Sequence, residues 1–228
     1  MGGDYGDYGD YGEWRRYYPL CITRIKVGDS IVNVGSGTSL KFEQAVKLHF
    51  PEIDPFSLDK NLVDSPASNH YQFEIGTDVL PELLLGRFTK VFCFEVIEHV
   101  RDMDELVAIL KSLLKVSDDA RIYISFPNLA SLICRIELLL GFQPHVLEVS
   151  KISSTFGTGK FGKFNSPGGN SIGHINGMTV AAMIDMAKSS GLTLTNSWGF
   201  MNFMKRWPKR FVSFGGTAVL EFGLSNIR

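Results

Sequence analysis

The stretch that decides the fold is Ile31-Val32-Asn33-Val34-Gly35-Ser36-Gly37-Thr38-Ser39. Its first four residues form an apolar run typical of a buried strand, and two glycines follow at once. Glycine at this point lets the chain bend sharply and lets the backbone approach a ligand without a Cβ in the way. The stretch therefore indicates either a tight strand-to-helix turn or the start of a cofactor-binding loop.

On both sides of this turn, apolar strands alternate with segments of helical spacing. Helices are predicted over 40–50, 102–114 and 179–190, and strands over 31–34, 55–58, 71–75, 90–94, 120–126, 192–197 and 217–224. This alternation is typical of a parallel sheet covered by helices on both faces. We expect an α/β fold, a Rossmann-like three-layer sandwich with a mostly parallel seven-stranded sheet and an antiparallel C-terminal strand.

The chain has 228 residues, of which 44% are hydrophobic and 21% charged, which suits one sizeable core rather than two. Residues 1–12 contain three successive Asp-Tyr-Gly triplets, which we interpret as a flexible tail. Residues 13–228 are predicted to form a single domain with an insertion at about 128–175. The formal net charge of −1 argues against a general electrostatic surface for nucleic acid.

The cellular compartment is predicted from three negative features. Cys21, Cys93 and Cys134 are odd in number and lack CxxC spacing, so neither a disulfide framework nor a zinc knuckle is indicated. The first residues lack the basic and apolar regions of a secretory signal. No apolar run reaches the roughly 20 residues of a membrane span, so no transmembrane helix is predicted. We expect a cytoplasmic protein.

A carboxylate follows the second predicted strand. Asp59, in Phe56-Ser57-Leu58-Asp59-Lys60, lies about twenty residues beyond the glycines, where a carboxylate can accept both hydroxyl protons of a ribose. Sites for nicotinamide dinucleotides and for S-adenosylmethionine (SAM) share this arrangement, so the two motifs alone do not distinguish them.

Three further segments carry a family resemblance: Gly76-Thr77-Asp78, Phe94-Glu95-Val96-Ile97-Glu98-His99-Val100 and Ile122-Tyr123-Ile124-Ser125-Phe126-Pro127-Asn128. With the glycine turn and Asp59, they resemble the class I SAM-dependent methyltransferases, especially the subgroup of ubiquinone-type O-methyltransferases. The chain departs from that pattern in two places, where Asn33 replaces an acid and Ser39 replaces a third glycine. The resemblance implies SAM as cofactor, bound by Gly35, Ser36, Gly37, Asp59, Lys60, Asp78, Val79 and Glu95.

The same resemblance implies a chemical site made of Glu95, Glu98, His99 and His174. This set is similar to the Glu-x-x-Glu-His plus distal His arrangement of small-RNA 2′-O-methyltransferases, where it holds a divalent metal. Oxygen ligands with some imidazole suit Mg²⁺ or Mn²⁺. Two alternatives stay open: His99 or His174, with Glu98, could act in catalysis as a metal-free general base, or all could be structural polar residues at the rim.

Substrate choice in this fold comes from segments added around the sheet. The run 129–141 reads as an amphipathic helix stopped by Gly141, with Arg135 and Glu137 on its polar side, and could be a packed helix, a lid or a membrane-surface contact. Four cations between Lys205 and Arg210 alternate with aromatic residues, a composition that permits nucleic-acid contact but suits a solvated face equally.

The leading hypothesis is a SAM-dependent methyltransferase that methylates a hydroxyl of a small-molecule, sugar or lipid-linked acceptor. Two alternatives remain: an RNA 2′-O-methyltransferase with a divalent metal, and a non-catalytic SAM-binding or interaction module marked by Asn33 and Ser39.

Overall fold

The computed structural model describes Arg15 and residues 17–61, 69–160, 162, 170–200 and 209–225, without the side chains of 209 and 210. The predicted Asp-Tyr-Gly tail and most of the basic segment around Lys205 lie outside these residues. Within the described part of the chain, no helix is long and apolar enough to cross a bilayer.

The centre of the molecule is one seven-stranded sheet with the order β3-β2-β1-β4-β5-β7-β6. Strands β1 to β5 run parallel, and β7 pairs antiparallel with both β5 and β6. This topology confirms the predicted fold class. The strands are β1 (Ile31–Val34), β2 (Phe56–Asp59), β3 (His70–Gln72), β4 (Lys90–Phe94), β5 (Arg121–Pro127), β6 (Leu192–Phe200) and β7 (Thr217–Leu224).

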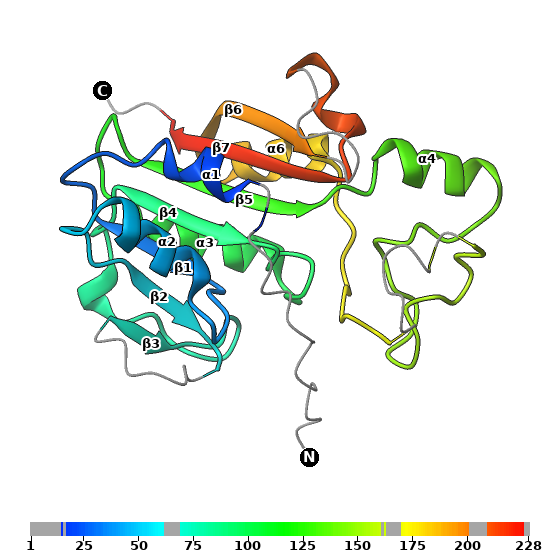
Figure 1. Cartoon of the computed structure of the whole chain (residues 1–228), viewed down its shortest axis with the longest axis horizontal. Helices are drawn as coiled ribbons and strands as arrows, with labels where there is room; N and C mark the ends of the chain where they lie inside the picture. The colour runs from blue at the N-terminus through cyan, green and yellow to red at the C-terminus, as the bar shows by residue number, and fades with distance from the viewer. Residues whose placement is uncertain are drawn as a thin grey trace.

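Helices cover both faces of the sheet. Helices α1 and α2 lie over one face, and α3 and α6 lie over the other (Figure 1). The described helices are α1 (Tyr18–Ile22), α2 (Lys41–His49), α3 (Met103–Leu113), α4 (Leu132–Leu139) and α6 (Val180–Ser189), with 3-10 turns at Glu82–Leu84 and Lys209–Phe214. The arrangement is a three-layer sandwich.

The central strands are apolar because both of their faces are buried. All residues of β1 and β4 are buried, and their side chains alternate between two hydrophobic clusters. Phe92 packs with the α1 and α2 side, whereas Val91 and Cys93 pack with the α3 and α6 side. A continuous apolar run is the pattern of a parallel strand with helices on both faces.

Two strands differ from the sequence prediction by more than one residue at an end. The predicted strand 71–75 is shorter, because the chain leaves the edge of the sheet after Gln72 and turns through Gly76, whose φ is +88°. The predicted strand 192–197 is longer and ends at Phe200, because it pairs with β7 along nearly its whole length. Neither difference alters the strand order.

Residues 128–175, named here the α4 lobe, project beyond the carboxyl ends of the parallel strands (Figure 1). The predicted polar side of α4 is wrong in one respect: Glu137 is 0% exposed, whereas Leu139 is 85% exposed. The reason is that His145 pairs with the Glu137 carboxylate from inside the lobe, at 2.8 Å. The polar residue therefore faces inward and the apolar residues at the end of the helix face outward.

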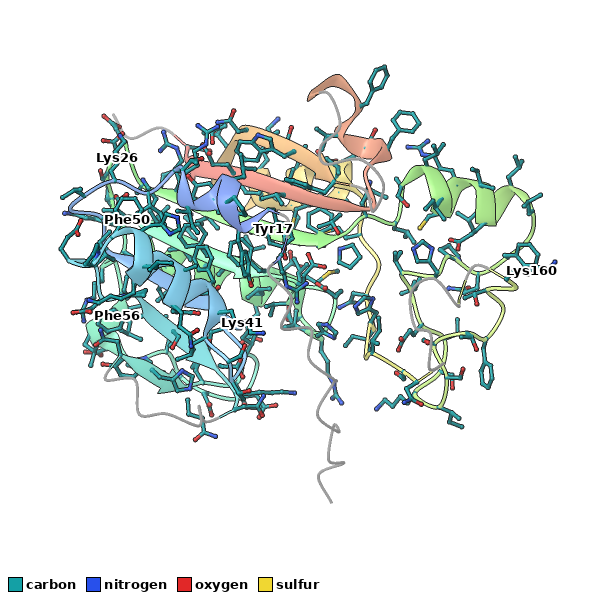
Figure 2. The ribbon with its side chains drawn as sticks, viewed as in Figure 1. Tyr17, Lys26, Lys41, Phe50, Phe56 and Lys160 are labelled. Carbon is teal, nitrogen blue, oxygen red and sulfur yellow. The ribbon has the colours of Figure 1, made fainter. Side chains whose placement is uncertain are left out.

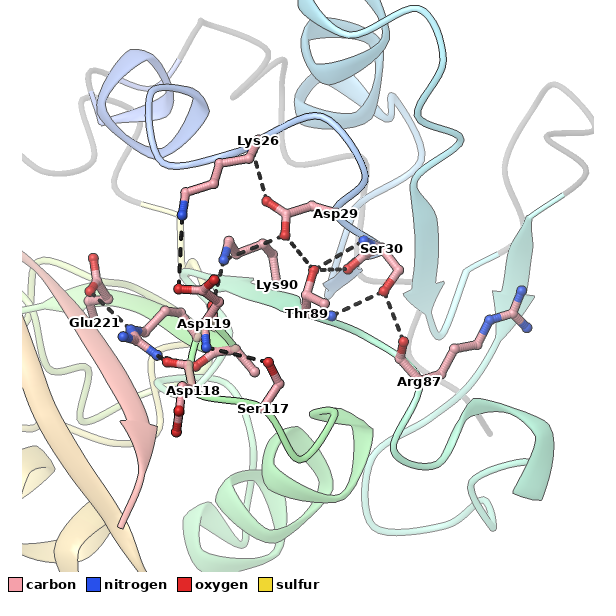
Figure 3. Close-up of polar contacts among 12 residues, drawn as sticks. Lys26, Asp29, Ser30, Arg87, Thr89, Lys90, Ser117, Asp118, Asp119 and Glu221 are labelled. Atoms are coloured by element: carbon pink, nitrogen blue, oxygen red, sulfur yellow. Dashed lines mark hydrogen bonds and ion pairs between the residues drawn. The ribbon is translucent and has the colours of Figure 1, made fainter. Parts of the chain in front are cut away.

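A buried ion pair lies at the amino end of β4, at the end of the sheet opposite to the α4 lobe (Figure 3). The Lys90 ammonium lies 3.6 Å from Asp29 Oδ1 and donates a 2.7 Å hydrogen bond to the carbonyl of Asp119. The side chains of Lys90 and Asp29 are only 4% and 9% exposed, and burial lowers the pKa of Lys90 while Asp29 raises it. Each charge therefore depends on the other for stabilisation.

We expect Asp29→Ala to lower the free energy of unfolding by about 3 kcal/mol, because it leaves the Lys90 ammonium buried without its counter-charge. The double variant Asp29→Ala with Lys90→Met should recover most of that loss. Urea denaturation measures both effects. Lys26→Ala is the control, since the Lys26 to Asp119 pair is 70% and 76% exposed and its removal should cost less than about 1 kcal/mol. Equal losses in the single and double variants would contradict the argument.

Candidate active site

The two glycines of the turn after β1 differ in what surrounds them. Gly35 and Gly37 have φ of +73° and +67°, which favour glycine. A Cβ on Gly35 would lie 2.2 Å from Cγ2 of Val96, so a larger residue would collide with the loop after β4. A Cβ on Gly37 would meet nothing within 4 Å. The turn therefore packs tightly on one side and faces open space on the other, as a cofactor loop requires.

Asp59 holds this turn in place from the end of β2. Its carboxylate accepts hydrogen bonds from the backbone N–H of Gly37 at 2.8 Å and of Asn61 at 2.9 Å. The backbone N–H groups of Gly35 and Ser36 donate to the carbonyl of Leu58. A carboxylate offers about four lone-pair positions, so Asp59 can accept further hydrogen bonds from a ligand.

Behind the glycine turn, Asn33 pairs with a carboxyl group that the sequence analysis did not identify. Asn33 Nδ2 donates a 2.8 Å hydrogen bond to Glu43 Oε1 on α2, and both residues are buried. Asn33 Oδ1 and Glu43 Oε2 have no hydrogen-bond partner. Burial raises the pKa of Glu43 to about 7, against the effect of the Asn33 hydrogen bond. A protonated Glu43 could donate to Asn33 and satisfy both remaining oxygens.

Glu95 follows β4 in a strained backbone conformation. Its φ is +55°, a left-handed value that non-glycine residues rarely adopt. Its Oε1 accepts a 2.7 Å hydrogen bond from the hydroxyl of Ser125, which also lies 3.0 Å from the hydroxyl of Tyr17. Tyr17 lies directly before α1, as its N-cap, and packs against the sheet (Figure 2). These contacts direct the Glu95 side chain toward β5.

A cation acts on the same carboxylates. Burial by itself would lower the pKa of Arg15, but negative neighbours that include Glu95 and Glu98 raise it above its ordinary value. Arg15 belongs to the aromatic and basic run from Glu13 to Pro19, for which the sequence leaves open a short helix, a flap over a ligand or a segment that packs on the domain. In the sequence, Arg15 is marked only by its position beside Tyr17 and Tyr18. The packing of α1 is needed to relate that position to the site.

Glu98, His99 and His174 converge near the end of β4. Oε1 of Glu98 lies 3.9 Å from Nε2 of His99 and 3.9 Å from Nε2 of His174. Glu98 is 4% exposed, and neither of its carboxylate oxygens has a hydrogen-bond partner among the described residues. A buried carboxylate without partners is costly, so it points to a missing proton or cation.

The two imidazoles are oriented by backbone carbonyls. Nδ1 of His99 lies 3.0 Å from the carbonyl of Gly173, and Nδ1 of His174 lies 3.0 Å from the carbonyl of Val146. Since a carbonyl only accepts, each Nδ1 carries the proton and each Nε2 presents a lone pair toward Glu98. Backbone carbonyls hold metal-ligating histidines in this same way.

Burial favours the uncharged forms of these three groups. Burial lowers the pKa of His99, helped by His174, and burial also lowers the pKa of His174. Burial raises the pKa of Glu98 well above its ordinary value, and the charge of Glu95 adds to the effect. Neutral imidazoles and a carboxylate that lacks partners are suitable ligands for a divalent cation.

The ligand atoms of Glu98, His99 and His174 lie within 4.8 Å of one another. Glu95, which was predicted as a fourth metal ligand, is not part of this set and bonds to Ser125 instead. Distances of 3.9 Å are too long for hydrogen bonds, and the side chains would have to approach to about 3.0 Å of one another to be neighbouring ligands of one octahedral ion at about 2.1 Å each.

Two predicted cofactor residues lie farther along the same edge of the sheet. Asp78 accepts a hydrogen bond from the backbone N–H of Glu74 and closes the turn after β3, and Val79 is 92% exposed. The charge of Lys60 acts on His99, so the end of β2 and the imidazole pair face a common region. The predicted residues thus gather at the carboxyl ends of the parallel strands, where ligands bind in open α/β sheets.

Solved structures of other proteins share the fold of this chain. No family model matches the chain, and no curated protein matches its sequence. A SAM-dependent methyltransferase from Thermotoga maritima is similar in structure with a TM-score of 0.57 at 9% identity, over 90% of this chain and 86% of the other. The CcbJ methyltransferase of Streptomyces caelestis has a TM-score of 0.55 at 12% identity, over 95% of both chains.

A third structure, magnesium protoporphyrin IX methyltransferase from Synechocystis with bound SAH, has a TM-score of 0.51 at 13% identity, over 87% of this chain and 75% of the other. At these identities the likeness concerns the fold alone. The chain therefore has the Rossmann-like fold of class I SAM-dependent methyltransferases.

The Asn33 and Glu43 pair generates a pH-dependent prediction. Because the pKa of Glu43 is about 7 in the folded chain and near its ordinary value in the unfolded chain, the unfolded state loses this proton first as pH rises. The contribution of Glu43 to stability should fall between pH 4.5 and 7 and then stay constant. The side chain of Glu43→Gln cannot ionise and keeps the hydrogen bond with Asn33. The variant should therefore be more stable than the parent at pH 8 by up to about 3 kcal/mol.

Urea denaturation at pH 4.5 and pH 8 measures this difference, which should vanish at the lower pH. Glu52→Gln is the matched control, because Glu52 is exposed and its replacement should leave the pH dependence unchanged. Parallel pH profiles for the Glu43→Gln variant and the parent would contradict the assignment.

Proposed function

We propose that this chain is a SAM-dependent methyltransferase that methylates a hydroxyl group of a small-molecule, sugar or lipid-linked acceptor, assisted by a divalent cation. The observation that carries the proposal is the buried, partnerless carboxylate of Glu98 between two imidazole lone pairs, at the ligand-binding edge of a methyltransferase fold. The acceptor needs a hydroxyl that can approach this group, and a vicinal diol or catechol suits it best, because a cation can chelate two neighbouring oxygens.

The residues around the glycine turn fit SAM. Asp59 would accept the ribose hydroxyl protons, and the open space before Gly37 leaves room for the cofactor to approach the backbone. Glu95 would face the methionine ammonium, and Arg15 supplies a positive charge for the methionine carboxylate. Ser36, Lys60, Asp78 and Val79 complete the proposed cofactor set. When bound, SAM would supply an electrophilic methyl group for the acceptor oxygen.

Glu98, His99 and His174 would hold the cation, and of the two proposed ions Mn²⁺ accepts imidazole nitrogen more readily than Mg²⁺, which prefers oxygen. The cation supplies Lewis acidity, which lowers the pKa of the hydroxyl to be methylated. The chain itself orients the site: Gly173 and Val146 fix both imidazoles through their carbonyls. The His99 side chain is 39% exposed, so the site can be reached by an acceptor.

A metal-free base would use the same lone pairs. If His99 or His174 removed the acceptor proton directly, its Nε2 would have to turn from Glu98 toward the acceptor. We favour the cation because it also accounts for Glu98, which a lone imidazole base would leave without a partner.

The alternatives have less support. The basic segment proposed for RNA binding lies outside the described residues apart from its final part, so nothing in the described surface favours an RNA acceptor over a small one. A non-catalytic module was suggested by the loss of an acid at Asn33. Glu43 provides a carboxyl group directly against Asn33, which weakens that argument. The cytoplasm remains the proposed location, in agreement with three buried, free cysteines.

We expect Asp59→Asn to weaken SAM binding about tenfold to one hundredfold, because it replaces a charged acceptor of ribose hydrogen bonds by a neutral one. Isothermal titration calorimetry with SAM and with S-adenosylhomocysteine measures the change. Asp54→Asn is the matched control, since Asp54 lies on the surface and pairs with Lys47. Unchanged binding in Asp59→Asn would remove the proposed cofactor site.

We expect Glu98→Gln and His174→Ala to abolish stimulation by Mg²⁺ or Mn²⁺ while leaving S-adenosylhomocysteine binding within about twofold, because they alter the ligands of the cation and not the cofactor loop. The measurement is acceptor-dependent release of S-adenosylhomocysteine with a catechol, with and without the ion. His49→Ala on α2 is the control. Metal-independent turnover in the parent would instead favour the imidazole base, and SAM binding without turnover on any acceptor would favour the non-catalytic module.

A further inference from the structure

The interior of the α4 lobe is polar. Its buried apolar side chains, among the described residues, are those of Cys134, Pro144 and Val146, whereas six buried residues there are polar: Asn128, Ser131, Glu137, Ser154, Thr158 and His174. Neither hydrophobic cluster of the sheet includes a described residue of the lobe. A small unit without an apolar core of its own needs another kind of cross-link, such as a metal ion.

Three metal-ligating side chains meet inside this lobe. Cys134 and Glu137 lie on the same face of α4, one turn apart, and His145 returns to them after the turn at Gly141, whose φ is +78°. Their ligand atoms lie within 4.8 Å of one another. Cys134 and Glu137 are 0% exposed, and the side chain of His145 is 16% exposed.

The Glu137 carboxylate organises this group. Its two oxygens lie 2.8 and 2.9 Å from Nδ1 of His145, and one of them also accepts a 3.1 Å hydrogen bond from the backbone N–H of His145. A fully buried carboxylate requires a positive charge beside it. Nδ1 of His145 holds a proton toward this carboxylate, and a bound ion would take the place of that proton. The imidazole, the carboxylate and a thiol one helical turn away would then offer it one nitrogen, one oxygen and one sulfur ligand.

We propose that Cys134, Glu137 and His145 bind a zinc ion that cross-links α4 to the chain after Gly141. The sulfur ligand distinguishes this cluster from that of Glu98, His99 and His174, which contains imidazoles but no sulfur, because a thiolate favours Zn²⁺. Three protein ligands leave one position of a tetrahedral ion for water, and the partial exposure of His145 gives solvent access to it.

The proposed zinc site is joined to the active site by one residue. Val146 follows His145 directly, and its carbonyl accepts the hydrogen bond from His174 Nδ1. An ion that fixes His145 would therefore fix the group that orients His174. The zinc proposal does not depend on the proposed methyltransferase activity, since it concerns the stability of the lobe.

Cobalt substitution tests the proposal on the intact chain. A thiolate bound to Co²⁺ gives an intense near-ultraviolet charge-transfer band that oxygen and nitrogen ligands do not give. We expect one equivalent of Co²⁺ to produce this band in the parent, Zn²⁺ to displace it, and Cys134→Ser to abolish it. His145→Gln should weaken Zn²⁺ binding, measured against a chelator, by more than about tenfold. Cys21→Ala is the matched thiol control and should keep the band.

A variant of the other site separates the two metals. Glu98→Gln combined with His174→Ala should keep the sulfur-to-cobalt band, whatever the outcome for methyl transfer. Alkylation followed by peptide mass spectrometry tests the parent without any substitution: Zn²⁺ should slow the modification of Cys134 by more than about tenfold relative to Cys93. Absence of the charge-transfer band in the folded parent, or equal alkylation rates with and without Zn²⁺, would overturn the proposal.

Discussion

The close packing of Gly35 against Val96 is the constraint on which the site depends. It joins the loop after β1 to the loop after β4, the two central parallel strands, at a separation that no side chain on Gly35 would allow. Asp59 closes the first loop from β2, and Glu95 and Glu98 flank Val96 in the second. The glycine turn after β1 and the loop after β4 are therefore packed as one unit, and movement in either would be transmitted to the other.

The two acids of the second loop have different environments although they are three residues apart. Glu95 adopts φ of +55° and is held by Ser125, whereas Glu98 is buried without a hydrogen bond between two imidazoles. The hydrogen bond from Ser125 holds the Glu95 carboxylate toward β5, whereas Glu98 lies between the two imidazoles. This separation is the basis for the different roles proposed for the two acids.

Much of the sheet could be predicted from the sequence because it depends on local patterns. The apolar runs of β1 and β4, the glycines after β1 and Asp59 after β2 are each readable within a few residues. The pairings of Asn33 with Glu43 and of Glu137 with His145 could not be read in this way. Each joins a helix to another segment, so the burial of its carboxyl group depends on the tertiary structure and not on helical periodicity.

The same distinction explains why α4 was misread. Periodicity assigns the apolar side of a helix to the interior, but this holds only where the interior is apolar. The α4 lobe has no apolar core of its own, so Glu137 points inward to His145 while Leu138, Leu139 and Leu140 face outward. The sheet is stabilised by hydrophobic burial and the lobe by specific polar contacts, and His174 lies where the two meet, bonded to Val146 of the lobe and facing Glu98 of the sheet. The position of His174 beside Glu98 thus depends on the polar contacts of the lobe.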